Sequence, residues 1–398
     1  MVQPAELQAY LGACAGWPRV HRLWYVIEHQ ASLRVWAATE VAALLQQTWD
    51  TERFRTACAL RGLPCSPAEE AWAAETDATT QQALAALLAD LSSCQVHGSR
   101  ETIRHAHMAL GDHYRACGRF REALVHHENA REYATEPAHM FDADRAAMET
   151  ASDAAEWARV LRHADHAEAS LDTQERLGHN TAPMRARLQA FRTLAHWALG
   201  ETKATAWPEP LGEPYDAYSD LCPPALCAWY AVLWALGAPP AQQRARVAQL
   251  QQSPMFRWWA QQAPAPSRVL DAYVQGDWAA VVQQLREARS IWACEPTLGV
   301  ARADACEEAV VQQLLARYLC AYRRVSLGSL EHVFGAPVLR LLVQLEEEGL
   351  AVRVDVAAQT VDEFTDSRLE QAALRHVQQA EALRRRWALA QRLQIGLR

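Results

Sequence analysis

Histidines and cysteines are the residues of this chain whose types could support metal or nucleophilic chemistry. His105 and His107 stand two residues apart, and at that spacing on a helix two side chains point about 200° away from each other. Such a pair cannot readily share one ion, and no aspartate stands where an H-x-H metalloprotease pattern needs it. We therefore predict surface or satisfied core histidines, no metal site and no cofactor. Two further histidine pairs are likewise isolated from carboxylates at ligand spacing, and we interpret them in the same way. These pairs are His126 with His127 and His163 with His166.

Cysteine chemistry is not indicated either. The ten cysteines are scattered without a C-x-x-C pair, and we expect reduced thiols buried in helices. Cys117 and Cys320 have no base nearby in the sequence, although a partner could arrive through the fold. The chain also lacks the motifs G-x-x-x-x-G-K-[ST], G-x-G-x-x-G, G-x-S-x-G and H-E-x-x-H. We predict that the protein is not an enzyme and has no catalytic residues.

Length and charge limit the class of protein. The 398 residues suggest two or three domains with a sizeable core, and 50% of the residues are hydrophobic. The net charge of −8 argues against nucleic acid as a partner. The sequence has no apolar run of about 18 residues, and its first residues have neither a basic start nor an apolar core. We therefore expect no membrane span and no signal peptide.

The stretch from Arg324 to Phe364 is expected to form the only sheet of an otherwise helical protein. Two short amphipathic helices are predicted first, the earlier one capped by Ser326 and the later one starting near Pro337. Residues 351–356 and 360–364 then alternate between apolar and polar, as strands with one buried face do. Helix, helix, strand, strand is the order of a winged helix.

The charges of this winged helix argue against DNA binding. The second helix would enter the major groove, yet it ends in three glutamates, residues 346–348, with only Arg340 to meet a phosphate. We predict instead that the small sheet offers an open edge to a strand of a neighbouring protein. The residues assigned to this edge are Val352, Val354, Val361 and Phe364.

Residues 99–315 are predicted to form an arm of stacked, tetratricopeptide-like helical hairpins. The segment from Leu110 to Pro137 has the small residues and the closing proline of a unit of roughly 34 residues. Its second helix recurs: an aromatic residue, an apolar residue four places on and an alanine six places further stand at the same offsets three times. These sets are Phe120, Leu124 and Ala130, then Trp157, Leu161 and Ala167, then Trp278, Val282 and Ala288. Three unrelated amphipathic helices are the alternative.

The remaining segments of the arm and the N-terminal part are also expected to be helical. Residues 1–98 are assigned to a separate N-terminal helical region. Residues 207–224 carry many prolines and no helical period, which predicts a loop within the arm. Dense tryptophan in helices is typical of core filling, and we prefer this to a ligand cage. The tryptophans concerned are Trp229, Trp234, Trp258 and Trp259.

After the winged helix, residues 316–366, a long helix is predicted over residues 367–398. Its apolar positions follow alternating steps of four and three, a spacing typical of a seam that packs against other long helices. We predict that this helix docks into a bundle with helices of other proteins. The seam residues assigned to this contact are Leu369, His376, Leu383 and Trp387.

Short segments, in order along the chain, carry a family resemblance. They are Ile27-Glu-His29, Leu33-Arg-Val35, Leu110-Gly-Asp-His-Tyr114, Cys117-Gly118, Ala130-Arg-Glu-Tyr133, Glu348-Gly-Leu350, Arg353-Val-Asp355 and Asp366-x-Arg368. Together with helical repeats, a winged helix and a long last helix, they resemble the PCI module. The proteasome lid, the constitutive-photomorphogenesis (COP) signalosome and translation initiation factor three share this module. Within that set, the chain is most similar to the subunit 1 family of the signalosome.

The resemblance implies a non-catalytic scaffold in the complex that removes the ubiquitin-like protein NEDD8 from cullin–RING ubiquitin ligases. The zinc-dependent isopeptidase of that complex is a different subunit. The implied partners are other PCI subunits, MPN-domain subunits through the helical bundle and, indirectly, cullin–RING ligases, in the nucleus and the cytoplasm. Two alternatives stay open: a scaffold subunit of the proteasome lid, and a nucleic-acid-binding winged helix, which the charges disfavour.

Replacing both Leu383 and Trp387 with aspartate should weaken assembly, because two charges would enter the apolar seam of the last helix. Truncating an interface anchor costs roughly 1–4 kcal/mol of binding, so we expect most sister subunits to be lost in co-purification. Circular dichroism of the variant provides the control for an intact fold. Unchanged assembly of a folded variant would exclude the bundle contact.

Overall fold

The computed structural model describes residues 3–12, 14–200, 211, 215–322, 324–335, 338–347, 352–355 and 358–363. Within these residues the chain is almost entirely α-helical and carries one small sheet, so the predicted fold class is confirmed. The predicted terminal helix, residues 367–398, lies outside the described residues. None of the described helices combines the length and the apolar composition that a membrane span requires.

The chain divides into two compact units, Met1–Val310 and Val311–Arg398. The finer sequence-based boundaries, after residues 98, 315 and 366, stay predictions. The helices of the first unit, the last of which runs on into the second, are α1 (Pro4–Tyr10), α2 (Gly16–His29), α3 (Arg34–Leu45), α4 (Thr51–Leu60), α5 (Pro67–His97), α6 (Arg100–Ala116), α7 (Phe120–Tyr133), α8 (Pro137–Asp153), α9 (Trp157–Arg176), α10 (Ala182–Leu199), the 3-10 helix η1 (Tyr215–Ala217), α11 (Pro224–Leu236), α12 (Pro240–Gln252), α13 (Pro254–Gln262), α14 (Pro264–Gln275), α15 (Trp278–Trp292) and α16 (Gly299–Leu319). The second unit adds β1 (Arg324–Ser326), α17 (Leu327–Phe334), α18 (Val338–Glu347), β2 (Val352–Asp355) and β3 (Thr360–Glu363).

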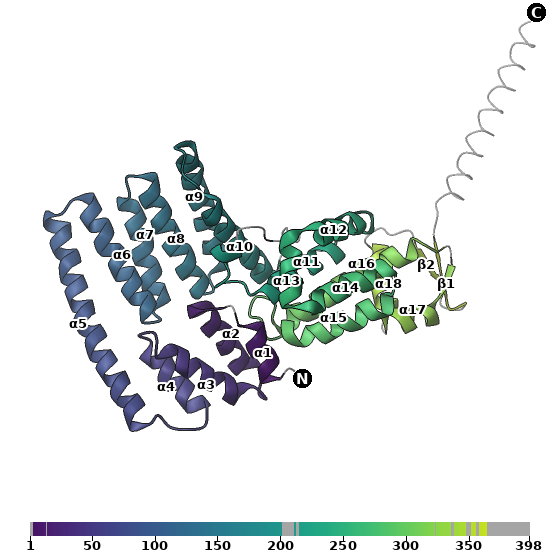
Figure 1. Ribbon diagram of the computed structural model, residues 1–398, viewed down its shortest axis with the longest axis horizontal. Helices are drawn as coiled ribbons and strands as arrows, with labels where there is room; N and C mark the ends of the chain where they lie inside the picture. Colours follow the sequence, from purple (N-terminus) through teal and green to yellow (C-terminus); the bar gives the residue numbers. More distant parts are fainter. Residues whose placement is uncertain are drawn as a thin grey trace, which may run out of the picture. The chain divides into compact units, whose positions relative to one another are not determined.

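Consecutive helices from α5 to α10 pack side by side in the first unit (Figure 1). A helical hairpin has an apolar face that it can bury only against the next hairpin, so such helices stack in order. Ser99 caps α6, because its hydroxyl accepts a hydrogen bond from the Thr102 N–H. At the crossing of α6 and α7, Gly111 lies against the buried ring of His127. That ring is hydrogen-bonded at 3.0 Å to Thr150 of α8, so one side chain links three helices.

The recurring aromatic residues begin three helices, as the sequence predicts. They are Phe120 of α7, Trp157 of α9 and Trp278 of α15. The alanine ten positions later is buried in all three helices. The apolar residue four positions later is buried in α7 and α15, whereas Leu161 of α9 is half-buried. The repeat therefore marks an equivalent packing position in the three helices.

Three of the four tryptophans assigned to the core are buried. Trp229 lies on α11, which is buried along nearly its whole length, and its ring meets Trp292 edge-on with centroids 5.2 Å apart. Trp258 is 40% exposed, and its ring lies 4.8 Å from that of Tyr215. The core interpretation is wrong for Trp258, since only its neighbour in α13 points inward. The interpretation is confirmed for Trp229, Trp234 and Trp259.

The second unit contains the predicted winged helix and one strand more than predicted. Ser326 caps α17 as expected, its hydroxyl accepting a hydrogen bond from the Ser329 N–H at 3.2 Å. The sheet order is β1–β3–β2 with antiparallel pairing throughout, so β3 is the central strand. The sequence does not reveal β1, because three residues directly before a helix cap are too few to show an alternation. The core of this unit includes Leu330, Phe334, Val338, Leu342, Leu345 and Val361.

Replacing Gly111 with alanine should destabilise the first unit, because the new methyl group would overlap the imidazole of His127. Moving this ring breaks its hydrogen bond to Thr150, and overpacking of a tight core costs typically about 1–3 kcal/mol. We expect a loss of this size in the free energy of unfolding, measured by urea denaturation followed by circular dichroism.

Gly328→Ala is the matched control for this prediction. Gly328 also lies in a helix, and a methyl group there would meet nothing within 4 Å. Alanine has the higher helix propensity by up to about 1 kcal/mol, so this variant should be unchanged or more stable. Equal effects of the two substitutions would contradict the close approach of α6 and α7.

Candidate functional site: interaction surfaces and buried clusters

The outward face of α18 is the first candidate, because it exposes apolar side chains. Leu339 and Val343 are 40% and 51% exposed, and they stand one helical turn apart on the same face. Glu346 and Glu347 are exposed at the end of the same helix, and Arg340 is its one exposed cation among the described residues. An apolar pair beside carboxylates suits a protein partner and repels the phosphates of nucleic acid.

The predicted sheet edge is formed by β2 and not by β3. Val352 and Val354 lie on β2, beyond which the described residues place no further strand. Val361 lies on the central strand β3 and is 2% exposed. The assignment of Val361 to the edge is therefore wrong, because the unforeseen strand β1 pairs with the other side of β3. The remaining predicted contact residues lie outside the described part of the chain: Phe364, Leu369, His376, Leu383 and Trp387.

A cavity of about 210 Å³ lies within the first unit. Its lining includes Trp24 and Tyr25 of α2 and Trp157 at the start of α9. The buried charged groups in the lining already have partners of opposite sign, since Arg22 pairs with Glu295 and Asp153 pairs with Arg115 of α6. These pairings explain the buried charges without a ligand.

The ion pair of Arg22 and Glu295 connects two segments that lie far apart in the sequence. Arg22 Nε donates to Glu295 Oε2 at 2.8 Å, and the two side chains are 5% and 0% exposed. The hydroxyls of Tyr10 and Thr297 also donate to this carboxylate, at 3.3 and 3.2 Å. Burial lowers the pKa of Arg22, but the facing Cys14 and Glu295 groups outweigh burial and hold it well above its usual value. The Arg22 guanidinium is therefore charged although it is buried, which requires every partner to stay in place.

Asp153 is a second buried carboxylate beside the cavity. Arg115 donates to it at 2.7 Å, and His21 Nε2 lies 3.5 Å away. Burial raises the pKa of Asp153, but the charge of Arg115 and the nearby His21 outweigh burial and lower the pKa below its usual value. Asp153 is therefore ionised at neutral pH and acts as a structural anion, not as a proton donor.

The expectation that His163 and His166 are isolated from carboxylates is wrong. The fully buried carboxylate of Asp144 in α8 lies against both rings: its Oδ1 is 3.0 Å from His163 Nδ1 and 3.6 Å from His166 Nδ1. Asp144 precedes His163 by 19 residues and belongs to another helix, so no local motif contains it. The available sequence signal is the spacing of three between the histidines, which puts them on one face of a helix.

Two other histidines also meet through the fold. The Nδ1 atoms of His107 in α6 and His126 in α7 are 3.1 Å apart, so one of them donates to the other. Burial lowers the pKa of both rings, and for His126 the neighbouring His107 lowers it further. Within the described part of the chain, no third metal-ligating side chain joins this pair.

Cys117 has a base nearby, contrary to the expectation from the sequence. His113 Nε2, one helical turn earlier, is 3.8 Å from the Cys117 sulfur. Burial raises the pKa of Cys117, and the charge of Asp50 raises it further. Because the thiolate is the reactive form, this environment does not produce a nucleophile.

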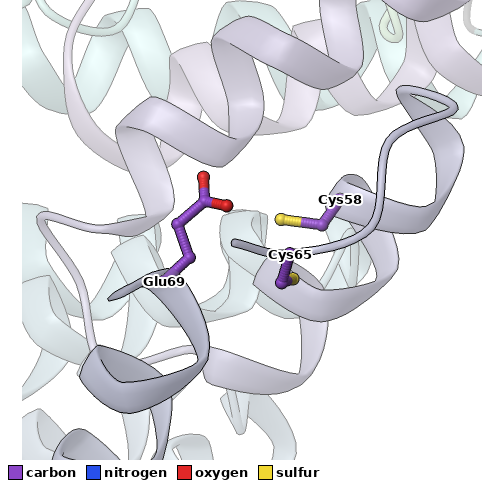
Figure 2. A group of neighbouring side chains, drawn as sticks. All are labelled: Cys58, Cys65 and Glu69. Carbon is purple, nitrogen blue, oxygen red and sulfur yellow. The ribbon is translucent and has the colours of Figure 1, made fainter. Parts of the chain in front are cut away.

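Cys58, Cys65 and Glu69 form a cluster at the connection between α4 and α5. Figure 2 shows the sulfur of Cys58 and the carboxylate of Glu69 directed toward each other. Hydrogen bonds from Arg61 and then from the Ser66 N–H lower the pKa of Glu69 to about 2, and both carboxylate oxygens accept from Arg61. Burial, followed by the contact with Cys65, raises the pKa of Cys58 to about 12. The carboxylate is thus used by a guanidinium and a helix cap, and the thiol is neutral.

Comparisons with known proteins identify relatives of the arm. A protein-family model described as "26S proteasome subunit RPN7" matches residues 69–237, which run from the first turn of α5 to the end of α11. A protein of Arabidopsis thaliana named "COP9 signalosome complex subunit 1" is 23% identical over 244 residues, 59% of this chain and 54% of the relative. The predicted resemblance is confirmed. The chain is thus similar to PCI-type subunits of multi-protein complexes.

A second relative covers a shorter segment. A protein of Drosophila melanogaster named "COP9 signalosome complex subunit 1b" is 28% identical over 117 residues, 29% of this chain and 22% of the relative. The matched part thus spans about half the length of the plant protein and about a fifth of the insect protein. Activities and partners of the whole relatives are therefore not transferred by the match itself.

Arg22→Met should destabilise the first unit strongly, because it leaves the buried Glu295 carboxylate without its cation. Breaking one side of a buried ion pair costs about 3–5 kcal/mol. We expect a loss of this size in the free energy of unfolding at neutral pH, measured by urea denaturation. The double variant Arg22→Met/Glu295→Gln should recover part of the loss, since no unpaired charge is then buried.

The matched control is Arg289→Met. Arg289 pairs with Asp304 at the surface, where each side chain is 48% exposed. An exposed pair contributes about 0–1 kcal/mol, so this variant should retain nearly its full stability. If both single variants lost the same free energy of unfolding, burial of the Arg22–Glu295 pair would not be the cause of the destabilisation.

Proposed function

We propose that the chain is a non-catalytic scaffold subunit of the COP9 signalosome, the complex that removes NEDD8 from cullin–RING ubiquitin ligases. The observation that carries this proposal is the similarity to signalosome subunit 1 over 244 residues. In this role the isopeptidase chemistry belongs to another subunit. The partners would be other PCI subunits, MPN-domain subunits through the helical bundle and, indirectly, cullin–RING ligases, in the nucleus and the cytoplasm.

The winged helix supports a role in protein contact. On α18, Leu339 and Val343 are exposed in a helix whose end carries two exposed glutamates. Exposed apolar side chains next to one another mark protein contacts when they form a patch rimmed by polar groups. A duplex would have to approach these carboxylates, whereas an apolar helix or loop of a sister subunit would cover the two side chains. The same face therefore favours a protein over nucleic acid.

The sheet offers the second contact of the proposed assembly. Among the described residues, β2 pairs only with β3, and an unpaired strand edge has free N–H and C=O groups for a further strand. Strand addition uses these main-chain groups for affinity. A neighbouring PCI subunit could add a strand beside Val352 and Val354.

A scaffold subunit of the proteasome lid is the second candidate function. The matched family model carries the description of a proteasome subunit, and the architecture of arm and winged helix fits both complexes. Mass spectrometry of the native complex purified through this chain separates the two. Signalosome subunits in the purified complex support the first proposal, and proteasome lid subunits support the second.

Val343→Asp should weaken assembly through the winged helix, because a charge would replace an exposed apolar contact. Interface residues of this kind contribute roughly 1–4 kcal/mol, so we expect at least a severalfold loss of PCI subunits in quantitative co-purification.

Val125→Asp supplies the control, since Val125 of α7 is also 51% exposed and the chemical change is identical. The control variant should assemble like the unaltered chain. If both variants assemble normally, α18 is not a contact surface. If both fail equally, a general loss of solubility explains the result.

A further inference from the structure

The cluster around Asp144 has the geometry of a site for a transition-metal cation. Its three donor side chains are Asp144 of α8 and His163 and His166 of α9, and their ligand atoms all lie within 4.8 Å of one another. Zinc binds imidazole nitrogen and carboxylate oxygen at about 2.0–2.1 Å, so neighbouring ligand atoms of a tetrahedral site are roughly 3.3 Å apart. The two measured distances, 3.0 Å from Asp144 Oδ1 to His163 Nδ1 and 3.6 Å to His166 Nδ1, lie on either side of this value.

One of these ligand atoms has no partner that explains its position. His166 Nδ1 is shielded from solvent and has no hydrogen-bond partner among the described residues. Its nearest carboxylate oxygen, Asp144 Oδ1, is just too far for a hydrogen bond. A shielded nitrogen without a partner costs free energy, and a shared cation would satisfy it. The His166 side chain as a whole is 41% exposed, so the cluster lies next to the surface of the arm.

The groups behind the three donors are arranged as supporting partners of a metal site. His163 directs its other ring nitrogen, Nε2, at Glu128 Oε1 of α7, 3.2 Å away. Asp144 receives a hydrogen bond at its second oxygen, Oδ2, from Arg131 Nε at 2.8 Å. Metal-binding histidines commonly donate their second ring N–H to a carboxylate, and ligating carboxylates are themselves hydrogen-bonded. In His163 and in Asp144, one polar atom is therefore held by a neighbouring side chain, and the other polar atom belongs to the candidate metal site.

The charges around Asp144, His163 and His166 favour a transition-metal cation over a hard cation. Two carboxylates, Asp144 and Glu128, face the guanidinium groups of Arg131 and Arg162, so the surroundings carry no excess of negative charge. Hard cations such as Mg²⁺ and Ca²⁺ need several oxygen ligands and gain little here. Imidazole nitrogens favour zinc and similar ions. The alternative cluster at Cys58 is less suitable, because its Glu69 carboxylate is held by Arg61 and by the helix cap.

We propose that Asp144, His163 and His166 bind one divalent transition-metal cation of the zinc type, with water completing the coordination. The ion would join α8 to α9 within the arm. Glu128 and Arg131 would act as positioning residues, because they hold His163 and Asp144 without touching the metal. The site is independent of the proposed scaffold role.

Zinc binding to the full-length chain tests this proposal. After removal of metal with a chelator, we expect equilibrium dialysis with metal analysis to find a zinc ion that His166→Ala does not bind. His166 is half-exposed, so the variant should fold, which circular dichroism checks. Bound zinc should raise the unfolding temperature of the unaltered chain and not that of His166→Ala. Magnesium should leave both unchanged.

Three further variants make the result specific. His179→Ala changes the same residue type at an exposed position after α9 and should keep the ion. The Cys58→Ser/Cys65→Ser variant should also keep it, and cobalt(II) in the site should show no thiolate charge-transfer absorption. Glu128→Gln should weaken binding about 10–100-fold, the effect usual for a supporting carboxylate. Zinc retained by His166→Ala, or zinc lost in the cysteine variant, would overturn the assignment.

Discussion

The arm depends on one constraint: an alanine-rich helical hairpin cannot bury its apolar face alone. Each helix from α5 to α10 packs on the next, and a glycine stands at the crossing of α6 and α7 because nothing larger than Gly111 fits beside the His127 ring. In a stack of this kind, each helical pair is stabilised by its interfaces with the neighbouring pairs. In this chain the buried pair of Arg22 and Glu295 adds a contact over 273 residues of sequence, which a purely nearest-neighbour array does not have. The first unit is thus held both by serial packing and by contacts between segments far apart in the sequence.

The parts of the fold that rest on local chemistry could be predicted from the sequence. The aromatic residues Phe120, Trp157 and Trp278 each begin a helix, and Ser326 caps another, because capping and helical periodicity act within a few residues. The strand β1 could not be found, because it gains its identity only by pairing with β3. For the same reason Val361 was assigned to an edge, whereas the third strand makes it a core residue.

The candidate sites show the same limit more clearly. The histidine spacing in α9 is visible in the sequence, but Asp144 comes from α8, and only the stacking of the two helices brings it within 3.0 Å of His163. Conversely, His113 stands one turn before Cys117 and was overlooked although the spacing is local. Its presence changes nothing chemically, since burial disfavours the thiolate. Two reactive side chains that lie close together therefore indicate a functional site only if their surroundings allow the protonation state that the chemistry requires.

Buried charges also explain how helices so rich in alanine find the correct neighbours. Small apolar side chains pack against one another with little discrimination, so the apolar faces alone leave several stacking orders nearly equal. Glu149 of α8 accepts hydrogen bonds from Arg115 of α6 at 2.9 Å and from Arg187 of α10 at 3.2 Å. Each of these contacts spans an intervening helix, so a helix stacked in the wrong order would leave Glu149 with only Arg145 of its own helix, 3.4 Å away. The two contacts of Glu149 with α6 and α10 therefore favour the observed order of these helices.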